Sequence, residues 1–449
     1  MLIRIKRQKN NILINPIRKK ENNLRTISLF GAVSIGIGGM VGGGIFAVLG
    51  EAVSLAHGAT PIAFFIAGIV AFLTAYSYAK LSTTYQSRGG TVTFIDNAFG
   101  HNLLSGSINL MLWMSYLVTI ALYASAFASY GITFFDNQTV LLHHILICVA
   151  ILLPAVINIV STSFVAKSES IIVAIKVILL IVVIVAGAFY MDFSRVAPSH
   201  YESANSIVVA GMIIFVAYEG FELIANAAQS IKNPEKNLPR AFYLSVGIVI
   251  VLYVLIALVA VTTVPEKELM EAKDYALAIA AKPALGMIGF KLVALAALLS
   301  TFSAINATIF GNAQLGYVIA KDGELPTVFE YQKGDIPMVG LLFTVILSLI
   351  IANFINLEEI AIIGSASFLL IFFIVNISAL KLYKTVQGSR AIFIVSSLAS
   401  FFALFTLLLH TYESNPIAII IFIGFIFIAI AFEMLYGKMV RGHFFQREY

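Results

Sequence analysis

The chain has 449 residues, of which 60% are hydrophobic and 11% are charged, and its mean hydropathy is +0.96. Because soluble domains carry about 25% charged residues, this composition excludes a water-soluble globular protein and indicates one embedded in lipid. The single cysteine, Cys148, excludes an intrachain disulfide and a metal site built from several cysteines. The formal net charge is +5, and the position of the basic residues along the chain indicates whether this charge faces nucleic acid or a membrane.

Basic residues predominate in residues 1–25, where Glu21 is the one acidic residue. A secretory signal peptide also begins with basic residues, but its apolar region is about 7–15 residues long and ends at a cleavage site of small residues. Here the apolar sequence is longer, and further apolar segments follow it. We therefore predict that residues 1–25 form an uncleaved basic arm in the cytoplasm.

The remaining sequence predicts an all-α integral membrane protein with twelve transmembrane helices, since about 20 apolar residues are needed to cross a bilayer. The predicted spans are 28–54, 60–84, 102–132, 139–159, 165–190, 207–231, 240–264, 286–318, 338–355, 359–383, 391–411 and 415–436. With the N-terminus inside, most of the 28 Lys and Arg residues fall on the inner face. The positive charge thus faces anionic lipid rather than nucleic acid. We predict a multi-pass protein of the cell membrane with both termini in the cytoplasm, and an amphipathic cap over the outer face at 265–285.

The first span contains a run of glycines that predicts a broken helix. Within Gly31–Ala56, glycine occupies positions 38, 39, 42, 43 and 44 (Gly38, Gly39, Gly42, Gly43 and Gly44). Each glycine disfavours helix by about 1 kcal/mol relative to alanine, and broken backbone within a bilayer occurs where it is buried in protein or lines a cavity. Glycines also support close helix packing, but such glycines are usually spaced by four, so we favour a break at a binding site. A dinucleotide-binding pattern at 42–47 lacks the strand that it requires.

The sixth span carries two acidic residues around a glycine in the sequence Tyr218-Glu219-Gly220-Phe221-Glu222. Acidic residues at this depth are costly and by default functional, although two paired or protonated acids could serve structure alone. Spans one and six are five helices apart, and interrupted helices at corresponding positions indicate an inverted-repeat transporter. We predict a transport core at 26–383, with spans 1–5 and 6–10 as the repeats. Residues 384–449 would add spans 11 and 12 and a short cytoplasmic tail.

Lys176 lies about 16 Å deep in the fifth span, at 1.5 Å per residue. Because removal from water disfavours the charged form of lysine, a lysine at this depth can exchange its proton near neutral pH. We therefore predict that Lys176 carries the coupling proton. The alternative is a permanently charged lysine that binds carbonyl groups of the span-one break for structure alone.

Two further spans supply candidate partners for these groups. Ser300 and Ser303 share a face of span eight, where their hydroxyls could meet Lys176 or a cation, although hydroxyls in helices also bond to their own backbone. In span three, Tyr116 lies nearest to mid-depth, with Trp113 and Tyr123 on either side of it. We predict that Tyr116 lines the cavity.

These segments resemble the amino acid–polyamine–organocation (APC) superfamily of transporters, and among them the archaeal proton-coupled amino-acid transporters. The resemblance runs from about residue 26 to 436 and rests on GIGGMVGGGIF, on SYAKL followed by SRGG, on VAYEGFELIANAAQSIKNPEKNLPRA and on SAINATIFGNAQLGYVIAKDGELP. It implies a LeuT-like 5+5 inverted repeat with broken helices 1 and 6, and a lysine at position 176 in the place of a sodium ion. The substrate-binding residues that it implies are Gly38, Gly39, Gly42, Gly43, Gly44, Ile45, Tyr116, Phe215, Tyr218 and Glu219. Glu219 departs from the family pattern, where many members have an apolar residue.

Together these features predict a proton-coupled amino-acid permease, a symporter that works by alternating access and not an enzyme. The substrate carboxylate would bind the backbone N–H groups of the first break, and coupling would run through Lys176. The alternative is an exchanger of amino acids or amines in which Glu219 or Glu222 titrates. We expect protons as the coupling ion, no metal or other cofactor, and an amino acid and membrane lipid as partners. The sequence leaves the substrate's identity and the oligomeric state open.

Overall fold

The structure is a computed structural model, and it describes residues 25–160 and 162–441, with the backbone alone for 162–170 and 440–441. The predicted basic arm therefore lies outside the described residues, apart from Arg25. Arg25 donates a hydrogen bond from Nη2 to Gln86 Oε1 over 3.2 Å, which ties the start of the described chain to the end of the second span.

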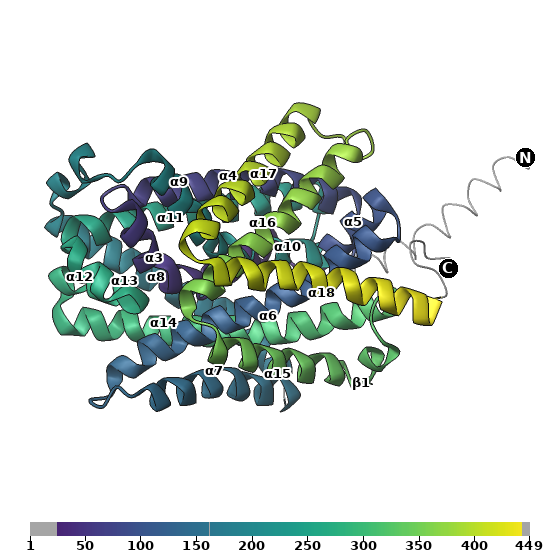
Figure 1. Ribbon diagram of the computed structural model, residues 1–449, viewed down its shortest axis with the longest axis horizontal. Helices are drawn as coiled ribbons and strands as arrows, with labels where there is room; N and C mark the ends of the chain where they lie inside the picture. The colour runs from purple at the N-terminus through teal and green to yellow at the C-terminus, as the bar shows by residue number, and fades with distance from the viewer. Residues whose placement is uncertain (1–24, 161, 442–449) are drawn as a thin grey trace, which may run out of the picture.

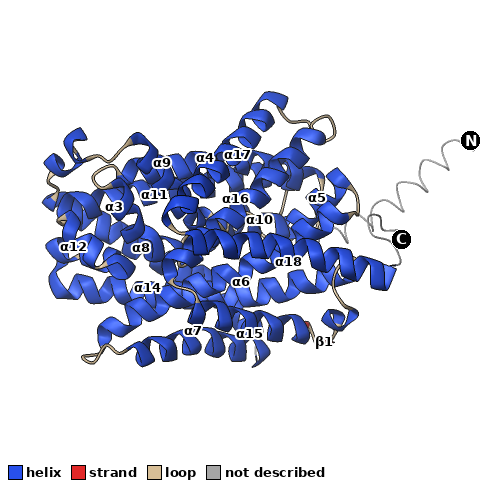
Figure 2. Cartoon of the chain, viewed as in Figure 1, coloured by secondary structure: helices blue, strands red, loops and turns tan. Residues whose placement is uncertain are grey.

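The described chain is helical almost throughout, as Figure 2 shows. Its α-helices are α2 (Leu29–Met40), α3 (Gly44–Ala56), α4 (Thr60–Thr84), α5 (Thr91–Phe99), α6 (Leu103–Gly131), α7 (Val140–Val160), α8 (Thr162–Gly187), α9 (Ala204–Ile213), α10 (Leu223–Asn226), α11 (Pro234–Thr263), α12 (Glu266–Glu271), α13 (Ala276–Ala280), α14 (Lys282–Lys321), α15 (Met338–Phe354), α16 (Leu357–Lys381), α17 (Arg390–Ser414) and α18 (Pro416–Arg441). The strands β1 (Gln332–Lys333) and β2 (Ile336–Pro337) pair antiparallel in a short hairpin.

The helices meet the expectation of an integral membrane protein. Within the described residues, ten helices are long and apolar enough to cross a membrane, and the bent pair α2–α3 raises the number to eleven. The predicted span 338–355 forms α15, which has 17 residues and is shorter than this test requires. The structure therefore supports an all-α membrane protein with ten or eleven spans by length, while the predicted number of twelve stays a prediction.

Helices α6, α7, α14, α15 and α18 lie roughly along the long axis of the molecule, and α16 and α17 run obliquely to it (Figure 1). In its most apolar stretch α6 is 94% buried, whereas α18 is 22% buried and exposes large apolar side chains. Large apolar residues face outward on α7, α8, α17 and α18 because lipid, and not water, is their solvent. At one end of the molecule lie α12 and α13, and at the other lie α5 and the β1–β2 hairpin (Figure 1).

Both predicted helix breaks are present. Helix α2 ends at Met40 and α3 begins at Gly44, with a bend of 48° between them. In the sixth span, α9 continues as the 3₁₀-helix η5 (Ile214–Tyr218), and Glu219 is then extended. Gly220 has φ of +117°, a conformation that residues with a side chain rarely adopt. The glycines thus fall where the backbone leaves the helix.

The predicted amphipathic segment also forms a compact element, which we call the cap (residues 265–281). It consists of α12, the 3₁₀-helix η7 (Lys273–Tyr275) and α13, and α14 follows at Lys282. The cap packs against α3, the second half of the first span. One end of the bundle, here the cap end, is therefore covered by this element (Figure 1).

Candidate functional site

The two helix breaks lie against each other in the interior. A Cβ atom built on Gly39 would come within 2.6 Å of the Gly220 carbonyl oxygen, and one on Gly44 would come within 2.6 Å of Ala217 Cα. Only glycine permits so close an approach of two backbones. The glycine run of span one and the segment around Gly220 of span six, which the sequence marked separately, therefore lie side by side.

The carbonyl groups freed by the first break accept hydrogen bonds from side chains of other spans. Lys176 on α8 is 2% exposed, and its Nζ donates to Gly38 O over 2.9 Å. Ser300 on α14 donates from Oγ to Val41 O over 3.0 Å and also contacts Gly42 O. The structure thus brings Lys176, Gly38 and Ser300 together at the position that the resemblance implies. Ser303 is buried three residues further along α14.

The second half of the first span presents unpaired backbone donors at the same place. Helix α3 begins at Gly44 without a side-chain cap, and Ala47 N donates to Gly43 O as the first helical hydrogen bond. The N–H groups of the first turn have no partner within a helix, and the helix dipole adds partial positive charge there. This geometry suits a carboxylate, and the carboxylate site at Gly42, Gly43 and Gly44 stays a prediction.

Two buried carboxyl groups occupy the break in the sixth span. Glu219 is 3% exposed and accepts a hydrogen bond from Tyr123 Oη over 3.2 Å. Glu222 is 1% exposed, accepts from Tyr116 Oη over 3.0 Å, and turns back to accept from Gly220 N over 2.8 Å. Buried acids without partners are costly, and here each has a tyrosine hydroxyl from α6.

Of the three aromatic residues among the predicted substrate-binding positions, Tyr116 and Phe215 lie in one cluster and Tyr218 lies apart from it. Phe215 lies against Phe372 with ring centroids 5.9 Å apart, and Tyr116 lies against Phe368 at 5.7 Å. Since Phe368 and Phe372 contact each other at 5.8 Å, Tyr116 and Phe215 belong to one aromatic cluster.

Tyr218 lies elsewhere, against α4 and α11. Its hydroxyl donates to Phe64 O over 2.8 Å, and its ring lies 5.2 Å from that of Tyr253. Tyr218 is the last residue of η5, and the backbone becomes extended directly after it at Glu219.

Two residues that sequence reasoning missed stabilise the breaks. Tyr253 on α11 is fully buried, and its hydroxyl contacts Met40 O over 2.7 Å and Ala217 O over 3.2 Å. Ser365 on α16 donates to Ile213 O over 2.5 Å and accepts from Val216 N over 2.9 Å. Each lies in a helix that contains other serines, threonines or tyrosines, so the sequence alone did not single it out.

We expect Tyr253→Phe to weaken both substrate binding and stability. The change leaves two buried carbonyl groups without this donor, and a lost buried hydrogen bond costs about 1–3 kcal/mol. Thermal unfolding of the purified protein and its substrate-induced shift would measure the two effects. Tyr412→Phe is the matched control, since Tyr412 is 70% exposed, and a wild-type substrate shift in Tyr253→Phe would contradict the expectation.

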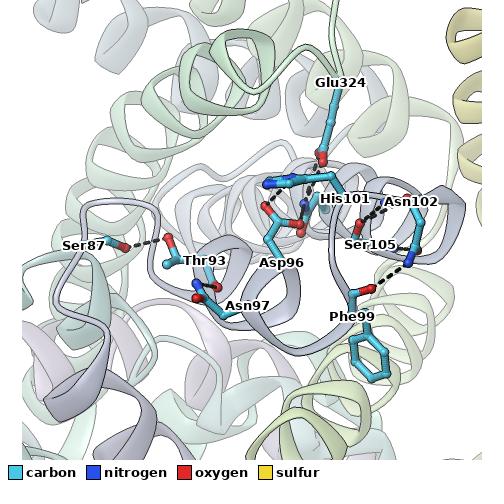
Figure 3. Close-up of polar contacts among 10 residues, drawn as sticks. Ser87, Thr93, Asp96, Asn97, Phe99, His101, Asn102, Ser105 and Glu324 are labelled. Atoms are coloured by element: carbon cyan, nitrogen blue, oxygen red, sulfur yellow. Dashed lines mark hydrogen bonds and ion pairs between the residues drawn. The ribbon is translucent and has the colours of Figure 1, made fainter. Parts of the chain in front are cut away.

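A second polar cluster lies at the end of the molecule opposite the cap (Figure 3). The amide of Asn109 on α6 donates to Asp96 Oδ1 over 3.2 Å and to both carboxylate oxygens of Glu324 over 3.1 Å. His101 Nδ1 lies 3.7 Å from Asp96 Oδ2. Ligand atoms of the two acids and the histidine lie within 4.8 Å of one another, but the Asn109 amide already binds both acids. The cluster joins α5, α6 and the segment that follows α14, and sequence reasoning did not group it because Glu324 lies 215 positions from Asn109.

Comparison with known proteins places this site in a family. The model of the amino acid permease family matches residues 27–441. Protein MJ0609 of Methanocaldococcus jannaschii is 36% identical over 95% of this chain and 98% of its own length. The inner membrane transport protein YbaT of Escherichia coli is 32% identical over 92% of this chain and 97% of its own.

A more distant similarity extends to mammals. The large neutral amino acids transporter small subunit 2 of Mus musculus is 27% identical over 73% of this chain and 64% of its own length. The family model covers nearly the whole described chain, including both breaks and Lys176. This chain therefore belongs to the amino acid permease family of the APC superfamily, and it is a transporter rather than an enzyme.

Proposed function

We propose that this protein is a proton-coupled symporter for amino acids that works by alternating access across the cell membrane. The observation that carries the proposal is the hydrogen bond from Lys176 Nζ to Gly38 O, beside Ser300 and at the first break. Because the Lys176 ammonium group can lose its proton, its protonation state would set the strength of the hydrogen bond between α8 and α2. Its protonation state would then bias the orientation of the half-helix.

The substrate is proposed to bind between the two breaks. Its carboxylate would lie on the N–H groups at the start of α3, and its ammonium group would meet carbonyl oxygens near Gly38 and Gly39 and at 215–218 in the second break. The side chain would lie toward the aromatic cluster of Tyr116 and Phe215. Because the mouse relative is named for large neutral amino acids, these are the first substrates to test. The termini would lie in the cytoplasm and the cap on the outer face.

The test is uptake of labelled amino acids into proteoliposomes that contain the purified protein. A symporter accumulates substrate in empty vesicles when an inward proton gradient is imposed, and collapse of the gradient stops the accumulation. A thermal-shift screen against amino acids and amines would identify the substrate beforehand. Failure of every tested amino acid to bind or enter the vesicles would refute the proposal.

An exchange mechanism is the second candidate, and the buried pair of Glu219 and Glu222 at the second break favours it. Two acids within one break can share a proton and bind a cationic substrate. Exchange would appear as uptake that requires substrate inside the vesicles and no proton gradient. Uptake into empty vesicles would count against it.

Under the symport proposal, we expect Glu219→Gln and Glu222→Gln each to retain proton-driven uptake. A glutamine carbonyl can still accept the bond from Tyr123 or from Gly220 N that the carboxylate accepts now. Initial uptake rates measured with and without the gradient would test this expectation. If either variant takes up substrate at the same rate under both conditions, the acid and not Lys176 carries the coupling proton.

A further inference from the structure

The cap is joined to two transmembrane helices by one lysine. Lys273 Nζ, in η7 of the cap, lies 2.7 Å from Glu51 Oε2 on α3 and 2.7 Å from Glu358 Oε2 at the start of α16. The three groups come from segments that are far apart in sequence. The ammonium group of Lys273 thus forms an ion pair with each of the two carboxylates and connects α3 to α16.

The bridge is more protected than an ordinary surface ion pair. Glu51 is 8% exposed, and the side chains of Lys273 and Glu358 are 40% and 38% exposed. Partial burial alone would lower the pKa of Lys273, but its hydrogen bonds to Glu358 and Glu51 outweigh this effect and hold the pKa above its usual value. Lys273 is therefore charged across the physiological range.

The cap also contacts α3 through its backbone. A Cβ atom built on Gly50 would overlap the Lys273 backbone carbonyl. Gly50 therefore allows the cap to lie directly on the helix, one residue before the acid that holds Lys273. Backbone contact and ion bridge occur at the same point, so the cap cannot lift from α3 without breaking both.

Helix α16 connects the bridge to the second break. Glu358 and Ser365 are seven residues apart, which is two helical turns and places them on the same side of α16. Ser365 bonds to Ile213 O and Val216 N of the sixth span. Glu51 likewise lies on the second half of the broken first span. The bridge therefore holds together the outer halves of both broken spans through α16 and the cap.

We propose that the Lys273 bridge to Glu51 and Glu358 is a latch that holds the cap end of the transporter closed. This inference rests on the proposed alternating-access function, since a latch is needed only where the two ends open in turn. For the cap end to open, α3 and α16 must separate, and Lys273 must release at least one of its two carboxylates. Nothing else in the bridge has to change.

The test uses labelling of the full-length purified protein, with the single cysteine removed by Cys148→Ala. Ala47 on α3 is 4% exposed and lies one turn below Glu51 on the same side, so Ala47→Cys reports opening beneath the latch. Ser82 on α4 is fully buried on the side of the α5 end, so Ser82→Cys reports loosening elsewhere. A charged, membrane-impermeant thiol reagent is then applied to each reporter.

We expect Lys273→Met to raise the labelling rate at Ala47→Cys by about tenfold, as a change of 1.4 kcal/mol in the opening equilibrium would, and to leave Ser82→Cys unchanged. Lys273→Arg, which keeps the charge, should label like the wild type. The matched control is Lys267→Met, in the same cap, because its partner Glu271 forms an exposed pair with it at 3.9 Å.

Two outcomes would overturn the latch. One is an unchanged labelling rate at Ala47→Cys in Lys273→Met, and the other is an equal rise at both reporters, which would show general loosening of the fold. The labelling does not depend on transport. A protein that labels as expected but takes up no amino acid would refute the proposed function and leave the latch in place.

Discussion

Replacing Lys176 with alanine is expected to abolish the effect of a proton gradient on amino-acid uptake. The change removes the ammonium group that donates to Gly38 O and with it the proposed site of the coupling proton. A hydrogen bond from a charged group contributes about 1.5–3 kcal/mol, so the balance between the two orientations of α2 shifts as well. Uptake into proteoliposomes with and without an inward proton gradient measures the loss, and counterflow in the absence of a gradient should persist.

Two variants make this result specific. Lys176→Arg keeps a positive charge that is not lost at accessible pH, so we expect it to bind substrate, as measured by thermal shift, without responding to the gradient. Lys291→Ala removes an exposed lysine from α14 and should transport like the wild type. Gradient-driven accumulation by Lys176→Ala at the wild-type level would show that the coupling proton is carried elsewhere.

The sequence was most informative about the interior of the first and sixth spans, because helix-breaking and charged residues carry a high free-energy cost inside a membrane. Glycine runs and charges are rarely tolerated in a span without a reason, so Gly42-Gly43-Gly44, Lys176 and Glu222 were found from composition and depth alone. The contact of Lys176 with the first break was implied by the family resemblance and by the alternative of a structural lysine, and not by depth. The bond to Gly38 O agrees with this expectation.

The sequence was least informative about which side chains meet across helices. Tyr253 and Ser365 stabilise the breaks, but they lie in helices with many similar residues, and helix rotation decides which of them point inward. The contacts of Tyr218 with Phe64 and Tyr253, rather than with the cluster of Tyr116 and Phe215, are another example.

Contacts between connecting segments were beyond sequence reasoning altogether. The bridge from Lys273 to Glu51 and Glu358 joins residues of the cap and of two separate helices, and each of these residues alone looks like an ordinary charge near the end of a span. The pairing of Asn109 with Glu324 spans 215 positions of the chain. Without homologous sequences, distances of this kind along the chain give no sign of contact in space.

Adding a methyl group at Gly44 is expected to weaken substrate binding at least tenfold. A Cβ there would lie 2.6 Å from Ala217 Cα, which is backbone of the second break and cannot turn aside. The two breaks must separate to accommodate it, and overpacking of this kind costs about 1–3 kcal/mol. The distance between the N–H groups of the first turn of α3 and the carbonyl groups of the second break then no longer matches the distance between the carboxylate and the ammonium group of an amino acid. Substrate affinity from thermal shift and KM for uptake measure the effect.

The neighbouring glycines give a graded series that separates binding from folding. At Gly43 the added Cβ meets the ring of Tyr123 instead of backbone, and a side chain can yield, so Gly43→Ala should lose less affinity than Gly44→Ala. Gly311→Ala on α14 is the matched control, because a Cβ there has no neighbour within 4 Å and alanine favours helix. If the first break holds the carboxylate, displacing α3 must lower the affinity for substrate. Equal substrate affinity in Gly44→Ala and Gly311→Ala would therefore contradict this role of the first break.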